Sequence, residues 1–160
     1  MKSLTLRKLN NSDIVLLTEW LNKDYIARWY HDTNAWLQEI NGRNGDYNWI
    51  HHFIAADGET PVGFCQYYDC YDAGDMEDWY EVSRRGETFS IDYLIGHACY
   101  LGKGYGKSLV QLLTDAVLQE EHAQRIIVQP DAENHASVRV LTANGYVYDE
   151  RGKFYCKSFK

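Results

Sequence analysis

A glycine-rich segment directly ahead of an amphipathic helix constrains the fold of this chain most. Residues 101–107 read Leu-Gly-Lys-Gly-Tyr-Gly-Lys, so three glycines alternate with larger residues. Because glycine has no Cβ, the backbone amides of such a turn can approach a ligand closely. Together with the positive end of the following helix and with Lys103 and Lys107, these amides suit a pyrophosphate. The segment therefore predicts an anion-binding turn between a strand and a helix.

Two other phosphate-binding sequences fit the segment less well. A Walker loop ending in Gly106-Lys107-Ser108 would need glycine at Leu101, and a dinucleotide fingerprint starting at Gly102 would need glycine at Lys107. A glycine-rich turn without a ligand is the remaining alternative. The surrounding sequence has to decide between these interpretations.

Hydrophobic periodicity predicts a mixed α/β sheet around the turn. Strands are predicted near residues 4–9 and over 49–56, 61–70, 88–95, 125–129, 146–148 and 154–159. Helices are predicted over 14–20, with an extension over 25–30, over 33–40, immediately after residue 107 through Leu109 to Val117, and over 136–143. Asn11-Ser12-Asp13 is predicted to cap the first helix. The order β-α-α-β-β-β-α-β-α-β-β places the glycine turn between the fourth strand and the third helix.

Length and composition are those of one globular domain, residues 1–160, with a full-sized core. The net charge of −7 argues against a nucleic-acid partner and is compatible with a polycationic ligand. Thirteen Tyr and five Trp supply enough aromatic side chains for a core and for an aromatic-walled cleft.

The N-terminal sequence and the cysteines favour a cytoplasmic location. Residues 1–8 alternate like a strand and lack the apolar core of a signal peptide, and no run approaches a membrane-spanning length. Four cysteines without a CxxC spacing indicate reduced thiols. The six histidines form no helical i, i+4 pair with a carboxylate, so no metal site is predicted. Because no apolar run is long enough to span a bilayer, no membrane partner is predicted either.

The succession of strand, glycine turn, helix, short strand and Asn134 before another helix resembles the GNAT family, the Gcn5-related acetyl-CoA-dependent N-acetyltransferases. The family's loop reads Q/R-x-x-G-x-G/A, with Leu101 here in place of Arg or Gln. The resemblance implies an α/β (α+β) GNAT fold, with a mostly antiparallel mixed sheet that splays between its fourth and fifth strands. It implies acetyl-CoA as co-substrate, bound by Leu94, Ile95, Gly96, Leu101, Gly102, Lys103, Gly104, Tyr105, Gly106, Lys107 and Asn134.

Shorter motifs narrow the resemblance to aminoglycoside 6′-N-acetyltransferases. They are Glu19-Trp20-Leu21-Asn22, Arg28-Trp29-Tyr30, the stretch 90–96 (Ser-Ile-Asp-Tyr-Leu-Ile-Gly), residues 101–104 and residues 130–134. In those enzymes an Asp at the position of Asp92 contacts the amine that is acetylated. The stretch 90–96 is the most specific of these motifs.

Asp92 can also be interpreted without the family. It lies in a β-forming segment shortly before the glycine turn, where a carboxylate could orient a substrate ammonium and accept a proton. An exposed or ion-paired strand Asp is the alternative. The predicted reaction is direct acetyl transfer from a thioester to a primary amine held in the same cleft. Backbone N–H groups over 94–96 are predicted to hold the pantetheine and polarise the thioester carbonyl.

An acidic, aromatic loop over residues 72–85 is predicted to form part of the substrate site. Aminoglycosides are polycations whose ammonium groups can meet carboxylates while their sugar faces lie on aromatic rings. A merely solvated loop is the alternative. The predicted substrate-binding residues are Trp29, Tyr30, Asp75, Asp78, Trp79, Glu81, Asp92 and Gln129.

Two positions depart from the family pattern. Many GNAT enzymes use a Tyr after the Asn134 position to protonate the leaving thiolate, and Leu141 aligns with it. A nearby Tyr, water or direct thiolate release could substitute, because a thiol with a pKa of about 8.5 is a tolerable leaving group. Gln129 stands where the aminoglycoside enzymes carry an acidic residue, which removes one charge from the expected cleft.

Three functions therefore remain open. The first is acetylation of the 6′-amine of aminoglycosides, a polycationic small-molecule substrate. The second is GNAT acetylation of another small amine, such as a polyamine, a siderophore precursor or an amino acid. The third is a non-catalytic acyl-CoA-binding module, which only the missing Tyr supports and which Asp92 argues against. The resemblance leaves both a monomer and a homodimer open.

Overall fold

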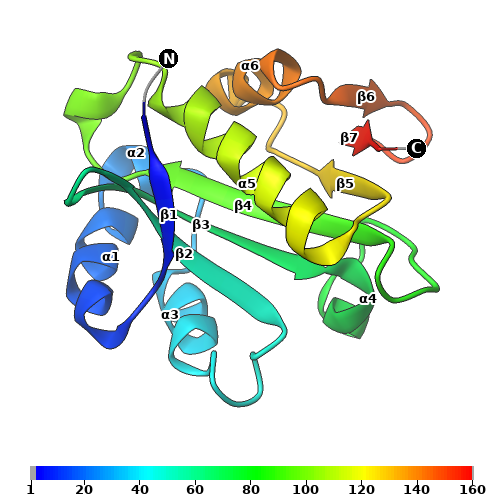
Figure 1. Ribbon diagram of the computed structural model, residues 1–160, viewed down its shortest axis with the longest axis horizontal. Coiled ribbons are helices and arrows are strands. Elements are labelled where there is room, and N and C mark those ends of the chain that lie inside the picture. Colours follow the sequence, from blue (N-terminus) through cyan, green and yellow to red (C-terminus); the bar gives the residue numbers. More distant parts are fainter. Residues whose placement is uncertain (1–2, 160) are drawn as a thin grey trace.

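The computed structural model describes residues 3–159 as a seven-stranded sheet with helices packed on it (Figure 1). The strands are β1 (Thr5–Lys8), β2 (Ile50–Asp57), β3 (Thr60–Asp69), β4 (Thr88–Ile95), β5 (Arg125–Val128), β6 (Val147–Asp149) and β7 (Phe154–Ser158). The helices are α1 (Ile14–Leu21), α2 (Asp24–Ala27), α3 (Thr33–Asn41), α4 (Cys70–Ala73), α5 (Tyr105–Glu121) and α6 (His135–Ala143), with 3-10 turns η1 (Asn11–Asp13), η2 (Gly74–Met76) and η3 (Ala98–Tyr100). The predicted order of the major elements is confirmed.

The sheet has the order β1-β2-β3-β4-β5-β7-β6, and β4 with β5 is its parallel pair among otherwise antiparallel neighbours. The β4–β5 pairing joins Thr88–Ser90 to residues 125–127, whereas β4 itself continues to Ile95. The two strands therefore separate beyond Ser90. Pro130 follows β5 closely and has no N–H to extend the ladder. The predicted splay is confirmed.

Two hydrophobic cores fix the two faces of β4. Leu109 and Leu113 of α5 pack in one core with Phe89 and Ile91. On the other face, α1 and α3 share a core with Leu94. Because successive side chains of a strand point to opposite faces, Asp92 lies on the α1–α3 face. Neighbouring residues of one strand thus serve two separate layers of the molecule.

The start of α1 differs in detail from the prediction. The Asn10 side chain caps the 3-10 turn η1 in a capping box with Asp13, and α1 begins only at Ile14. Asp13 forms a two-pronged ion pair with Arg7 at 2.7 Å and accepts the Asn10 N–H at 2.9 Å. Asp13, the last residue of the predicted tripeptide, occupies the N-cap position of α1, but its carboxylate is bonded to Arg7 and to the Asn10 N–H and makes no capping hydrogen bond to α1.

The acidic loop is partly ordered as α4 and η2 and is tied together at its base. The Asp69 carboxylate accepts N–H groups from both ends of the loop, from Tyr71 at 3.0 Å and from Gly86 at 2.6 Å. This clasp holds the loop beside the first residues of β4. Within residues 3–159, no helix combines the length and apolar character needed to cross a bilayer.

Candidate active site

The glycine turn has the backbone that an anion-binding turn requires. Gly102 and Gly104 adopt φ values of +72° and +86°, in the left-handed region where L side chains are strained. No heavy atom lies within 4 Å of a Cβ built at either position, so both backbones face open space. The first helical bond of α5 runs from Ser108 N–H to Gly104 O at 3.2 Å. The amides of Gly106 and Lys107 therefore point out of the helix N-terminus, as pyrophosphate binding needs.

A groove of about 470 Å³ runs from this turn along β4 to α6. Its walls are mostly apolar, which suits the pantetheine arm of a cofactor as well as its phosphates. The structure places eight of the predicted cofactor residues on this groove: Leu94, Ile95, Leu101, Gly102, Gly104, Gly106, Lys107 and Asn134.

Three predicted cofactor residues do not line the groove. Gly96 donates its N–H to Val62 O at 2.7 Å, and a Cβ there would overlap the Trp20 indole, so this glycine serves packing. Tyr105 is buried and its hydroxyl donates to Asp57 at 3.0 Å. Lys103 is exposed outside the groove walls.

The splayed edge of β4 presents the backbone of Tyr93 and Ile95. The Tyr30 hydroxyl donates to Tyr93 O, and the Tyr25 hydroxyl donates to Ile95 O at 2.7 Å. Because N–H and C=O of one strand residue point to the same side, the Tyr93 and Ile95 amides also face the gap. Of the predicted residues 94–96, Ile95 thus presents its amide to the gap, and Tyr93, just outside that range, supplies the other amide.

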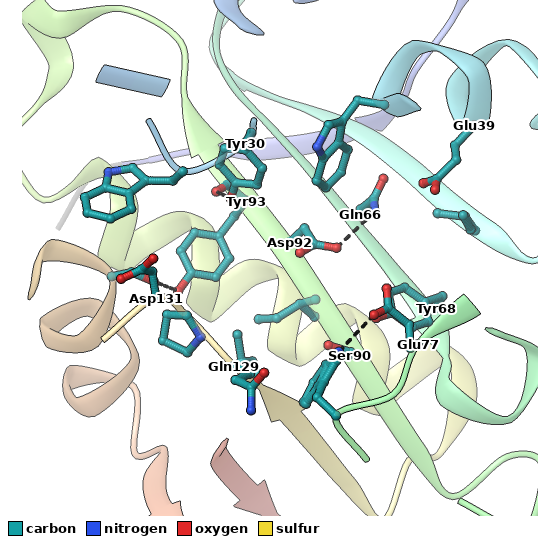
Figure 2. A pocket seen from close by; sticks show the side chains of 18 of the residues that line it. Tyr30, Glu39, Gln66, Tyr68, Glu77, Ser90, Asp92, Tyr93, Gln129 and Asp131 are labelled. Carbon is teal, nitrogen blue, oxygen red and sulfur yellow. Dashed lines mark hydrogen bonds between the residues drawn. The ribbon is translucent and has the colours of Figure 1, made fainter. Parts of the chain in front are cut away.

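A second cavity of about 350 Å³ opens on the other side of the splay and contains Asp92 (Figure 2). Its floor is the α1–α3 face of the sheet, where Gln66 Nε2 donates to Asp92 Oδ2 at 3.0 Å. Gln66 Oε1 is buried and has no hydrogen-bond partner within the described chain. A free acceptor beside a carboxylate suits a ligand that brings N–H donors.

Four carboxylates line this cavity: Asp92 on β4, Glu39 on α3, Glu77 in the acidic loop and the exposed Asp131 shortly after β5. Burial, opposed by the Gln66 hydrogen bond and assisted by Glu77, raises the pKa of Asp92 to about 6. Burial, assisted by Asp92 and Glu77, raises the pKa of Glu39 to about 7. Burial and Asp78 raise the pKa of Glu77. The ion pairs found among residues 3–159 are Arg7–Asp13 and Arg85–Asp72, so none neutralises this set.

The acidic loop contributes the predicted Trp79 but a different carboxylate from those predicted. Glu77 and Trp79 line the cavity, and Trp79 Nε1 donates to Glu77 Oε2 at 3.1 Å. Asp75, Asp78 and Glu81 are exposed and lie outside its walls. The loop therefore delivers one carboxylate and one indole.

The other predicted substrate residues lie at the cavity. Trp29 and Tyr30 form part of its wall. Gln129 lines it as well, with its Nε2 donating to Lys153 O at 2.9 Å. Sequence reasoning missed the remaining polar and aromatic lining residues that matter most here, Trp36, Glu39, Trp49, Gln66, Tyr68 and Glu77.

The groove and the cavity meet at a shared set of residues: Trp29, Tyr30, Tyr93, Asn134 and Ser137. Asn134 caps α6 by accepting the Ser137 N–H at 3.2 Å. Leu141, one turn further along α6, is fully buried and reaches neither space. This junction is where a donor in the groove would meet an acceptor in the cavity. No group of three or more His, Cys, Asp or Glu within residues 3–159 is arranged to hold a metal ion.

Comparison with known proteins agrees with this geometry. The family model described as "Acetyltransferase (GNAT) domain" matches residues 10–154. Aminoglycoside N(6′)-acetyltransferase type 1 from Klebsiella pneumoniae is 27% identical over 154 residues, covering 90% of this chain and 74% of that protein.

Solved structures extend the likeness to the whole fold. The crystal structure of aminoglycoside acetyltransferase AAC(6′)-Ib in complex with coenzyme A has a TM-score of 0.84 at 25% identity, covering 98% of this chain and 95% of that one. The same enzyme with paromomycin and acetyl-CoA has a TM-score of 0.84 at 25% identity, covering 99% and 94%. Because the family model spans most of the sequence, this chain belongs to the GNAT acetyltransferase family.

Proposed function

We propose that this protein transfers the acetyl group of acetyl-CoA to the 6′-amine of aminoglycosides. The observation that carries the proposal is the cavity with Asp92, Glu39 and Glu77, which has no basic partner within the described chain and opens onto the groove of the glycine turn. A half-buried carboxylate set of this kind favours a substrate with several ammonium groups. The similar enzymes AAC(6′)-Ib and the Klebsiella acetyltransferase, named for aminoglycosides, support this substrate class.

Acetyl-CoA fits the groove residue by residue. The Gly106 and Lys107 amides and the α5 N-terminus would bind the pyrophosphate, and the apolar groove would take the pantetheine arm. The Tyr93 and Ile95 amides at the splayed edge of β4 would hydrogen-bond this arm and the thioester carbonyl. An amide aimed at that oxygen stabilises the negative charge that develops there during attack.

Asp92 would orient the attacking amine and accept a proton from it. Its pKa of about 6 leaves the carboxylate charged near neutral pH and still basic enough for proton transfer. Gln66 holds one carboxylate oxygen at 3.0 Å and offers its own Oε1 to a second N–H of the ammonium. The amine then attacks the thioester carbon across the junction of the two spaces.

Glu39, Glu77 and the aromatic walls would recognise the rest of the substrate. Glu39 and Glu77 enter the cavity from α3 and from the loop, so they meet ammonium groups other than the one beside Asp92 (Figure 2). Trp36, Trp49 and Trp79 provide rings for the apolar sugar faces. Glu39 and Glu77 provide the negative charge that Gln129 lacks.

The test is a thiol-release assay with acetyl-CoA and a panel of amines. The panel contains kanamycin, tobramycin, an aminoglycoside with a 6′-hydroxyl, spermidine and lysine. Turnover of the 6′-amino drugs without turnover of the 6′-hydroxyl compound is expected. Turnover of spermidine or lysine alone would move the substrate to another amine, and acetyl-CoA binding without any turnover would indicate a binding module. A cytoplasmic location and a monomeric or homodimeric state remain predictions.

A further inference from the structure

One hydroxyl pair at the junction has no part in amine binding. The Tyr93 hydroxyl lies 2.5 Å from Ser137 Oγ, and both residues line the cofactor groove as well as the amine cavity. Tyr93 follows Asp92 on β4, so its side chain points to the opposite, α5–α6 face of the sheet. Figure 2 shows its ring on the other side of the strand from the Asp92 carboxylate. The Asp92 carboxylate, which would hold the amine, and the Tyr93 hydroxyl thus lie on opposite faces of β4, on either side of the place where the thioester would bind.

We propose that Tyr93, supported by Ser137, is the general acid that protonates the departing CoA thiolate. The inference rests on the proposed acetyl transfer and assigns the one proton that Asp92 does not handle. The hydroxyl points toward α6, which lines the groove from the side of β4 opposite to Asp92. In this protein the general acid would therefore be a residue of β4, whereas in many GNAT enzymes it is a Tyr on the helix that corresponds to α6.

Competing donors at the junction are already engaged or absent. The Tyr30 hydroxyl donates to Tyr93 O and the Tyr25 hydroxyl to Ile95 O. Tyr146 bonds Thr114 at 2.7 Å and lines neither space. Leu141 is apolar and fully buried. Tyr93 is therefore the tyrosine whose hydroxyl bonds a second hydroxyl at the junction instead of a carbonyl oxygen.

The proton count closes with these groups. The bound ammonium first gives one proton to Asp92, which passes it to solvent. The nitrogen of the resulting neutral amine then forms a bond to the thioester carbon and loses a second proton to Asp92. The carbon–sulfur bond breaks, and the sulfur takes the proton of the Tyr93 hydroxyl. Ser137 passes its own proton to the Tyr93 oxygen and regains one from solvent, while Asp92 releases its proton to solvent. The products are the N-acetyl amine and the CoA thiol. Burial also raises the pKa of Tyr93, which keeps its proton in place before transfer.

The first test compares Tyr93→Phe with wild type in kcat and in acetyl-CoA affinity. A general acid typically contributes about 10²–10⁴-fold, so kcat should fall by about 100-fold or more while the Kd of acetyl-CoA stays within about threefold. Tyr146→Phe removes a buried tyrosine hydroxyl that lines neither space and serves as the matched control, with kcat unchanged. Ser137→Ala should lower kcat less than Tyr93→Phe. Wild-type kcat in Tyr93→Phe, or a loss equalled by weaker acetyl-CoA binding, would overturn the proposal.

The second test needs no acceptor and separates this inference from the proposed function. CoA is bound to each protein, and its thiolate absorbance is titrated with pH. A hydroxyl that donates to the sulfur stabilises the thiolate, so the pKa of the bound thiol should be higher in Tyr93→Phe than in wild type. Equal thiol pKa values would contradict the proposal whichever amine is the substrate. A wild type that acetylates another amine but no aminoglycoside, and whose bound thiol pKa still depends on Tyr93, would contradict only the aminoglycoside assignment.

Discussion

The cofactor groove and the amine cavity are built in opposite ways. The phosphate end of the groove uses main-chain amides within a few residues of one glycine turn, held by φ values that favour glycine. The cavity uses side chains from α3, β3, β4 and the acidic loop, which lie far apart in sequence. Backbone recognition tolerates changes at neighbouring side chains, as Leu101 at the usual Arg or Gln position illustrates. Recognition by side chains depends on the identity of each lining residue. A substitution in the cavity can therefore change which amine is bound.

The largest effect is expected from Asp92→Asn, which separates chemistry from donor binding. The variant keeps the shape and an oxygen for the Gln66 hydrogen bond but cannot accept the proton of the amine. We expect kcat to fall by about 10²–10⁴-fold, measured by thiol release at saturating acetyl-CoA. Retention of more than half of the wild-type kcat would remove Asp92 from the chemistry.

The same substitution should stabilise the fold at high pH only. The pKa of Asp92 is raised from 3.8 to about 6 in the folded state, so ionisation above pH 4 favours the unfolded chain, and the full penalty is reached above pH 6. At 1.36 kcal/mol per pKa unit the penalty is up to about 3 kcal/mol. Denaturant unfolding should show Asp92→Asn more stable than wild type at pH 8 and equal to it near pH 3. Equal stability at both pH values would mean that Asp92 carries no burial penalty.

Glu39→Gln and Glu77→Gln should weaken the binding of polycations with little change in acetyl-CoA affinity. Loss of one ammonium partner is expected to raise the KM of an aminoglycoside by roughly tenfold, about 1.4 kcal/mol. Asp78→Asn, which changes an exposed charge of the same loop, should raise it less, and Glu59→Gln in the β2–β3 turn is the control for net charge. A larger effect from Asp78→Asn than from Glu77→Gln would restore the sequence-based view of the loop.

The smallest effect is expected in the groove itself. Lys107 is exposed beside the turn, and exposed charge pairs are worth about 0–1 kcal/mol. Lys107→Ala should therefore weaken acetyl-CoA binding by no more than about fivefold, and high salt should narrow the difference. Titration calorimetry of acetyl-CoA at two salt concentrations measures this. A hundredfold loss of acetyl-CoA affinity would mean that the Lys107 side chain, rather than the backbone amides, provides most of the phosphate binding.

The contrast between the regions also explains what the sequence could predict. The glycine turn, the order of the elements and the splay follow from local periodicity and family motifs, and the structure confirms the order and the splay. Glu39 and Gln66 were not predicted as substrate-binding residues, because the hydrophobic patterns of their helix and strand do not show which cavity their side chains face. In the acidic loop, Glu77 rather than its exposed neighbours lines the cavity, a choice fixed by the Asp69 clasp and the Trp79 hydrogen bond. Spacing in a loop cannot reveal such a choice.

Tyr105 and Gly96 show the same limit inside a recognised motif. Both occupy motif positions, yet Tyr105 turns its side chain into the core toward Asp57, and Gly96 makes room for Trp20. Alternate backbone amides of β4 face the splay. The hydrogen bonds from Tyr25 and Tyr30 to the carbonyl oxygens of Ile95 and Tyr93 identify which residues these are.

The division of labour between the two regions is tested most directly by titrating acetyl-CoA calorimetrically into wild type, Asp92→Asn and Gly104→Asp. Gly104 has a φ of +86° and open space in front of it, so Asp there adds strain and a negative charge where the pyrophosphate should lie. We predict equal affinity within about threefold for wild type and Asp92→Asn (under about 0.7 kcal/mol) and no detectable binding to folded Gly104→Asp. Unchanged binding to folded Gly104→Asp, or its loss in Asp92→Asn, would contradict the account.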